Sequence, residues 1–335
     1  MKKNTDITDE QMYNHLLFEF GIGTGKRKIN ESRGVVDSVN DFLIKFLDEV
    51  QGQITAAFSN RCTTKHEYEG NTEKYGCETF FKEFRILLSL SAINEERLSY
   101  NGGFEPFNSF FEDEEGNVIC RPSINLRVLA ASEIRMRRCI AFSLGHELTH
   151  AYNTYRYAQK YGINSLKRNI LRTQNYGNLQ HYSSPMYSHN TQAMAGVLYG
   201  LNRMERNAYI AQLRQEMAAD AQWIKSAEDA MEVLKTTDSY ERFKLLEKNV
   251  ETILGERYEP VKKEILDATN AMIRDGKRKP FSNWHQLTKY FSYVWEDWKK
   301  KYLIMASKIA YDISARKNME LDGDLMNKKI NLKVK

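Results

Sequence analysis

The clearest chemical signal in the sequence is a pair of histidines, His146 and His150, with Glu147 between them. On an α-helix each residue turns by about 100°, so the two imidazoles share one face, about 40° apart, and Glu147 lies about 100° from His146. Two neutral imidazoles one turn apart can bind the same Zn²⁺, and a carboxylate beside them can take a proton from a water molecule that the metal activates. The spacing predicts a zinc site with Glu147 as general base.

The residues around this motif predict the helix that the chemistry requires. The side of the helix opposite the histidines, about 120–200° from His146, carries the apolar residues Ile140, Leu144, Leu148 and Ala151. Such a helix can bury its apolar side in a core and present both imidazoles to a cleft. The alternative, a helix with two solvated histidines and an ordinary carboxylate, fits this pattern less well.

The motif His146-Glu147-Leu148-Thr149-His150 resembles that of the zincin metallopeptidases, whose active-site helix lies behind a small mixed sheet. The resemblance covers residues 80–220 and implies an α+β fold, Zn²⁺ as cofactor and a peptide or protein substrate. Metzincins need a third histidine soon after the second, and the residues that follow His150 exclude that subclass. A gluzincin, in which a later glutamate is the third ligand, remains.

Two glutamates compete for the third position. Glu205 lies at the edge of an apolar stripe, and its context, Glu-x-x-Ala followed by an aromatic residue, resembles the third-ligand helix of gluzincin-like proteins. Glu216 and Asp220 resemble the Glu-x-x-x-Asp segment of thermolysin-like enzymes. We favour Glu205, because its stripe predicts that it faces the core, where a carboxylate is costly unless it meets a cation. Asp220 would then be a surface acid or an acceptor for a ligand imidazole.

The connection over 156–192 is polar and aromatic, and it contains His181, Tyr182, Tyr187 and His189. One of these could stabilise the oxyanion of a tetrahedral intermediate, as a Tyr or His does in similar enzymes. His181 or His189 could also replace the glutamate as a metal ligand. A surface loop with incidental aromatic residues explains the stretch equally well.

Hydrophobic periodicity predicts a sheet upstream of the motif and helices elsewhere. Alternation predicts strands over 84–92, 104–111 and 118–128, with Pro122 making the last an edge or bulged strand. A 3–4 spacing predicts helices over 37–50, 240–253, 261–272 and 284–298. The expected organisation is a mainly helical region (1–79), a zincin-like catalytic domain (80–225), a C-terminal helical region (226–325) and a basic tail (326–335).

Other patterns do not carry a function. The Gly-rich segment 21–27 fails the phosphate-loop template, because Phe20 and Arg27 occupy required Gly and Ser/Thr positions. Cys62, His66 and Cys77 lack the four-ligand spacing of a structural zinc site. A net charge of +5 from 49 basic and 44 acidic residues does not favour nucleic acid as the partner.

The chain shows no export signal, because no apolar segment follows its first two lysines, and no run of about 18 apolar residues predicts a membrane helix. Four cysteines without such a signal are typical of reduced thiols. We therefore expect a cytoplasmic or virion-associated protein. Similar H-E-L-x-H-A-Y and E-x-N-A-Y patterns occur in phage and gut-bacterial proteins. A competing hypothesis is thus a non-catalytic, zincin-fold component of a phage particle, with assembly partners on its C-terminal helices.

Overall fold

The computed structural model describes residues 31–77, 79–94, 99–167, 183–201, 203–220, 224, 227–272 and 280–316. The predicted Gly-rich turn (21–27) and basic tail (326–335) lie outside these residues. The described residues divide into two units, one that lies within 31–167 and 207–220 and one that lies within 183–206 and 224–316. The boundary after Arg206 falls inside the continuous helix α8 (Arg203–Ala219). The domain limits expected from the sequence stay predictions.

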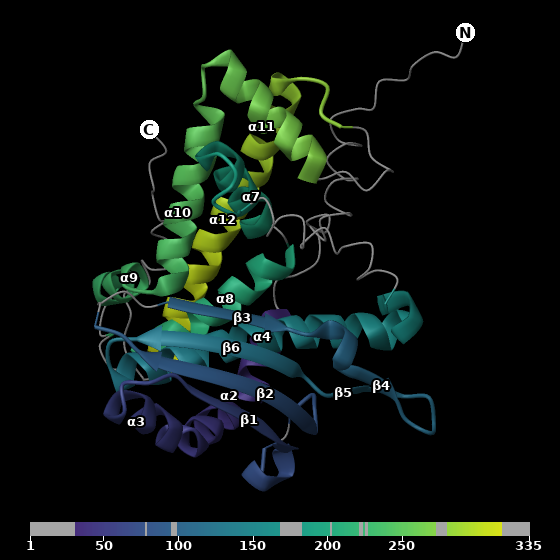
Figure 1. Cartoon of the computed structure of the whole chain (residues 1–335), viewed down its shortest axis with the longest axis vertical. Helices are drawn as coiled ribbons and strands as arrows, with labels where there is room; N and C mark the ends of the chain where they lie inside the picture. Colours follow the sequence, from purple (N-terminus) through teal and green to yellow (C-terminus); the bar gives the residue numbers. More distant parts are fainter. Residues whose placement is uncertain are drawn as a thin grey trace. The chain divides into compact units, whose positions relative to one another are not determined.

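The first unit contains a four-stranded sheet with strands in the order β1-β2-β6-β3 (Figure 1). These strands are β1 (Thr64–Asn71), β2 (Glu83–Ala92), β6 (Ser123–Ala130) and β3 (Ser99–Phe104). β2 and β6 are parallel and the other neighbouring pairs are antiparallel. The fold is thus α+β with a small mixed sheet, as the sequence predicts.

Two of the predicted strands are wrong in detail, and a proline explains each. The strand expected over 104–111 is broken by a 3₁₀ turn, Pro106–Asn108, because Pro fixes φ and lacks an N–H for the ladder. Its remainder, β4 (Phe110–Glu112), pairs with β5 (Val118–Cys120) in a separate hairpin. Pro122 separates β5 from β6, which is an interior strand rather than an edge strand.

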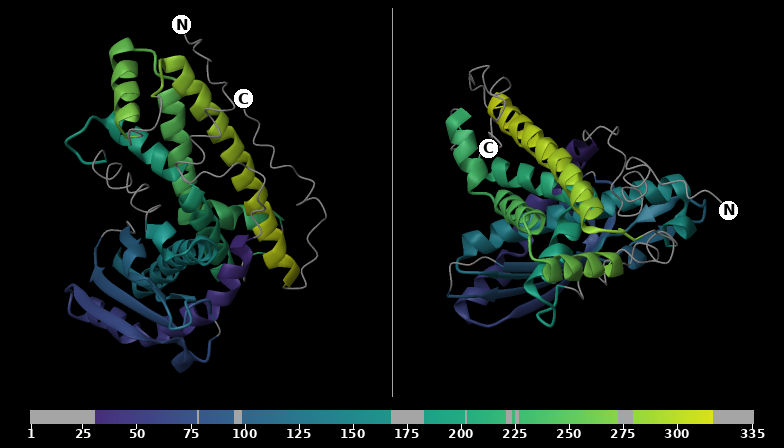
Figure 2. Two further views of the ribbon diagram at one scale, coloured as in Figure 1. Left: turned by 90° about the vertical axis from the view of Figure 1, so that its right-hand side faces the viewer. Right: turned by 90° about the horizontal axis from the view of Figure 1, so that it is seen from above.

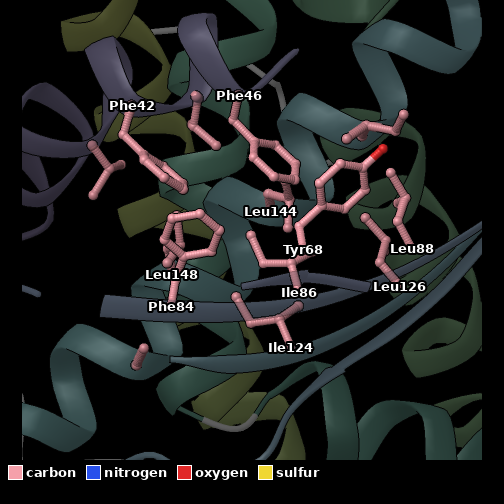
Figure 3. Close-up of a cluster of buried hydrophobic side chains, with 14 of the residues drawn as sticks. Phe42, Phe46, Tyr68, Phe84, Ile86, Leu88, Ile124, Leu126, Leu144 and Leu148 are labelled. Atoms are coloured by element: carbon pink, nitrogen blue, oxygen red, sulfur yellow. The ribbon is translucent and has the colours of Figure 1, made fainter. Parts of the chain in front are cut away.

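One face of the sheet is buried under the helices α2 (Glu31–Glu49), α3 (Gln51–Ser59) and α4 (Glu133–Tyr161). Alternate residues of the two central strands face this core: Phe84, Ile86, Leu88 and Leu90 on β2, and Ile124, Leu126, Val128 and Ala130 on β6. Figure 3 shows Phe42 and Phe46 of α2 and Leu144 and Leu148 of α4 in the same cluster. Each such side chain contributes roughly 1.5–3 kcal/mol of burial energy. The core therefore fixes α4 against the sheet.

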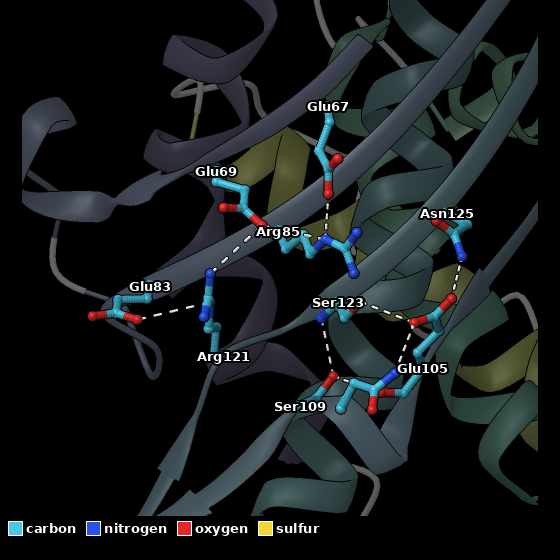
Figure 4. A network of polar contacts seen from close by, with 10 residues as sticks. Glu67, Glu69, Glu83, Arg85, Glu105, Ser109, Arg121, Ser123 and Asn125 are labelled. Atoms are coloured by element: carbon cyan, nitrogen blue, oxygen red, sulfur yellow. Dashed lines mark hydrogen bonds and ion pairs between the residues drawn. The ribbon is translucent and has the colours of Figure 1, made fainter. Parts of the chain in front are cut away.

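The other face of the sheet is polar (Figure 4). Arg85 pairs with Glu67 and Glu69, and Arg121 pairs with Glu69 and Glu83. These pairs are solvent-exposed, so each contributes little to stability. A hollow on this face is lined by Glu69, Arg85, Asn108, Arg121 and Ser123. The histidine motif, on α4, is on the opposite, buried side.

The second unit is helical. Its helices include α7 (His189–Gly200), α9 (Ala227–Lys235), α10 (Asp238–Leu254), α11 (Glu259–Met272) and α12 (Trp284–Arg316). The helices predicted over 240–253, 261–272 and 284–298 are confirmed, and α12 extends beyond its predicted end. Figure 2 shows α12 beside α10, where Phe243 stacks on Tyr302 with ring centroids 4.2 Å apart. In the described ranges no helix is long and apolar enough to span a bilayer.

Candidate metal centre

Helix α4 carries the motif, and its position is fixed by a cap at its N-terminus and by buried leucines next to and within the motif. Its N-terminus is capped by Ser132, whose hydroxyl accepts a hydrogen bond from the Arg135 N–H. Leu144 and Leu148 are fully buried in the sheet core. Because the apolar side of the helix is held in this way, the direction of its other side chains is fixed too.

The two histidines lie together, as their spacing predicts. The Nε2 atoms of His146 and His150 are 3.1 Å apart, and the side chains are 4% and 8% exposed. Both rings therefore direct Nε2 to one point. With the ring proton on Nδ1, each Nε2 offers a lone pair to a metal ion there.

Glu205, in the first turn of α8, completes the group. One ligand atom from each of His146, His150 and Glu205 lies within 4.8 Å of the other two, and all three side chains are buried. Among the residues that the structure describes, these three side chains form the one group of at least three His, Cys, Asp or Glu residues that could hold a metal ion. The glutamate favoured from the sequence is thus the one that meets the histidines.

The donor set fits a divalent ion of the zinc type. Ligand atoms of a tetrahedral zinc at Zn–N distances of about 2.0–2.1 Å lie roughly 3.3 Å from one another. The 3.1 Å separation of the two Nε2 atoms is close to that value. Two imidazoles and one carboxylate are also the protein ligands of many catalytic zinc sites. This buried group could hold a metal ion, and its donors are suited to zinc.

Glu147 lies beside the histidines and against the edge of the sheet. Its carboxylate oxygen Oε2 accepts a hydrogen bond of 2.9 Å from the backbone N–H of Phe104 in β3. A side chain at Gly102 would place its Cβ 3.6 Å from Oε1 of the same carboxylate. Glu147, 7% exposed, is therefore held between α4 and β3.

Tyr209 also contacts the site, and the sequence reasoning missed it. Its ring lies 5.1 Å from that of His146, centroid to centroid. It comes four residues after Glu205, so the two side chains share a face of α8. That spacing is the signal in the sequence that points to Tyr209, whereas the aromatic candidates expected from the sequence all lie within 156–192.

Glu216 and Asp220, the acidic residues considered beside Glu205, contact other groups. Glu216 is buried and accepts a hydrogen bond of 2.6 Å from Gln212, one turn earlier. Asp220 accepts hydrogen bonds of 2.7 and 3.4 Å from Arg138 of α4 and so binds a guanidinium rather than a ligand imidazole.

The loop candidates are not part of this group. His189 begins α7 and is exposed, and Tyr187 is half-buried just before it. The other two candidates of that connection, His181 and Tyr182, lie outside the described residues.

All four cysteines are free thiols. Burial raises the pKa of the Cys120 thiol, which therefore stays protonated and unreactive at neutral pH. Cys62 is exposed and Cys77 half-buried, and neither belongs to the metal-binding group.

Comparisons with known proteins add no relative: no family model, no curated protein and no solved structure matches this chain.

Proposed function

We propose that this protein is a zinc-dependent peptidase of the gluzincin type. The observation that supports the proposal is the meeting of His146, His150 and Glu205 at one point, with Glu147 beside them at the edge of the sheet. Metal-assisted hydrolysis requires such a set of groups: three ligands that leave one coordination position open, and a carboxylate nearby.

Each residue has a role in that reaction. His146 and His150 would hold Zn²⁺ through Nε2, and Glu205 through a carboxylate oxygen. Bound zinc would polarise the scissile carbonyl and lower the pKa of a water molecule. Glu147 takes a proton from the attacking water as general base and later gives it to the leaving amine. The hydrogen bond from the Phe104 N–H would hold the Glu147 carboxylate in place for this proton transfer.

The position of β3 favours a peptide as the substrate. β3 is an outer strand of the four-stranded sheet, and Glu147 lies against it. An extended peptide can add to such an edge through main-chain hydrogen bonds. Gly103 leaves open space where a side chain would otherwise be, so the backbone is accessible there.

Metal analysis together with a proteolysis assay tests the proposal. We expect about one zinc per chain, and loss of at least 100-fold in peptide cleavage for Glu147→Gln with zinc content unchanged, since a general base typically contributes 10²–10⁴-fold. Glu133→Gln, on the same helix but in its first turn, is the matched control and should cleave like the wild type. Zinc content near zero, or full activity of Glu147→Gln, would disprove the proposal.

A zinc-binding, non-catalytic assembly protein is the second candidate, and the separate helical unit favours it. The two candidates differ in one result. Stoichiometric zinc without cleavage of any member of a peptide library would support the assembly protein.

A further inference from the structure

Gly145, which directly precedes the first histidine, contacts Gln215 of α8. A Cβ at Gly145 would lie 1.9 Å from Oε1 of Gln215, 2.4 Å from Nε2 and 2.5 Å from Cδ. Carbon atoms in contact are normally about 3.5–4 Å apart, so only glycine fits at this position while the amide stays in place. The amide ends a flexible side chain, but Gln215 is only 8% exposed, so to admit a Cβ the amide has to find other room among buried neighbours or α8 has to move.

The contact is one of shape rather than of hydrogen bonding. Neither Oε1 nor Nε2 of Gln215 has a hydrogen-bond partner within the described part of the chain, and both atoms are buried. The amide lies in the space that the missing side chain of Gly145 leaves. Its position is therefore set by the close approach of the two elements.

Three contacts show how α8 runs along α4. Tyr209 meets His146, Gln215 meets Gly145, and Asp220 meets Arg138. Tyr209 and Gln215 belong to α8 and Asp220 directly follows it, so three successive points of this segment contact α4. The Asp220–Arg138 pair is partly exposed and weak, whereas the Gly145 contact is buried.

A change at Gly145 reaches the metal centre through α8. Glu205 lies ten residues before Gln215 on the same continuous helix, a distance of about 15 Å at 1.5 Å per residue. Because a helix moves as a stiff rod over this length, a shift or rotation at Gln215 displaces the carboxylate of Glu205 from the histidines.

We propose that the Gly145–Gln215 contact sets the spacing and rotation of α8 on α4, and that these two residues are positioning residues for the metal centre. The inference rests on the proposed function, because it concerns the same ligands. It assigns a role to two residues that bind no metal themselves.

Metal affinity of the full-length protein tests this inference, by competition with a chromophoric chelator. Gly145→Ala should weaken Zn²⁺ binding at least tenfold and weaken the binding of the larger Cd²⁺ less, because a wider group of ligands favours the larger ion. Gly145→Ala combined with Gln215→Ser should restore zinc affinity to within threefold of the wild type. Gly52→Ala is the matched control, since Gly52 is also a helical glycine but no atom lies within 4 Å of the position that its Cβ would take.

Equal losses of Zn²⁺ and Cd²⁺ affinity, wild-type zinc affinity of Gly145→Ala, or failure of the double variant to recover would overturn the inference. Wild-type protein that binds no zinc would instead refute the proposed function. Thermal unfolding followed by circular dichroism identifies a variant that has not folded, and the double variant, which relieves the clash, then provides the decisive affinity.

Discussion

Glu147 shows how a single backbone group can control a side chain at the residue scale. β3 is an outer strand, so it has a neighbouring strand, β6, on one side only. The backbone N–H of Phe104 points to the other side, where it donates a hydrogen bond to the Glu147 carboxylate instead of to a strand. A hydrogen bond to a charged acceptor is worth about 1.5–3 kcal/mol. The orientation of the proposed base therefore depends on the backbone N–H of Phe104. Only a substitution by proline removes this N–H.

Phe104→Pro removes this N–H, and we expect it to lower kcat by roughly 10- to 150-fold, the equivalent of 1.5–3 kcal/mol. Zinc content should stay unchanged, since Phe104 is not a ligand. Phe104→Ala is the control: it also loses the ring contact with Phe110 but keeps the N–H. Steady-state kinetics on one peptide compares the two, and equal kcat values for them would contradict the role of the N–H.

At the scale of elements, local patterns predicted the helices well and the long-range partners less well. The face of α4 followed from Leu144 and Leu148, because helical periodicity is a local property. Strand β1 was missed because Tyr68 is its one buried residue, so its sequence does not alternate. Tyr209 was missed because its contact with His146 depends on how α8 packs on α4. The choice of Glu205 depended on the same packing, and only its apolar stripe was visible in the sequence.

The pairing of α10 with α12 provides a prediction about stability and pH. Glu247 of α10, with 9% of its side chain exposed, pairs with Lys299 of α12 at 2.6 Å and with Lys244 one turn away. Burial alone would raise the pKa of Glu247, but the hydrogen bonds from the two lysines outweigh it and hold this pKa below 4.5. A carboxyl group whose pKa is lowered by folding stabilises the folded state above its unfolded pKa, and this contribution is lost as the pH falls through the folded pKa.

Glu247→Gln should therefore lower the free energy of unfolding of the helical unit by roughly 3 kcal/mol at pH 7, because it leaves Lys299, whose side chain is 14% exposed, without its counter-charge. The difference from the wild type should shrink as the pH falls through the lowered folded-state pKa of the Glu247 carboxyl group, because that group is then protonated. Glu241→Gln, an exposed position on the same helix, is the control. Urea unfolding over a series of pH values from 7 downward measures both differences, and a pH-independent difference would refute the assignment.

On the scale of the whole molecule, the chain combines a sheet-containing unit, which carries the histidines, with a helical unit that has its own aromatic core. The metal-binding group draws on residues far apart in the sequence, from His146 to Glu205. Such a group exists only in the folded state, so metal binding and folding are thermodynamically linked.

This linkage predicts that zinc raises the melting temperature. At a free zinc concentration 100 times Kd, binding stabilises the folded state by about 2.7 kcal/mol, or roughly 5–10 °C for a unit of this size. Glu205→Gln should lose most of the shift, because it removes one of three ligands, whereas His66→Gln, an exposed histidine of β1, should keep it. Mg²⁺ at the same concentration should give no shift, since it prefers oxygen ligands and retains its water. Differential scanning calorimetry with and without a chelator measures these shifts. An equal shift for Glu205→Gln and the wild type would mean that zinc stabilises the protein from another site.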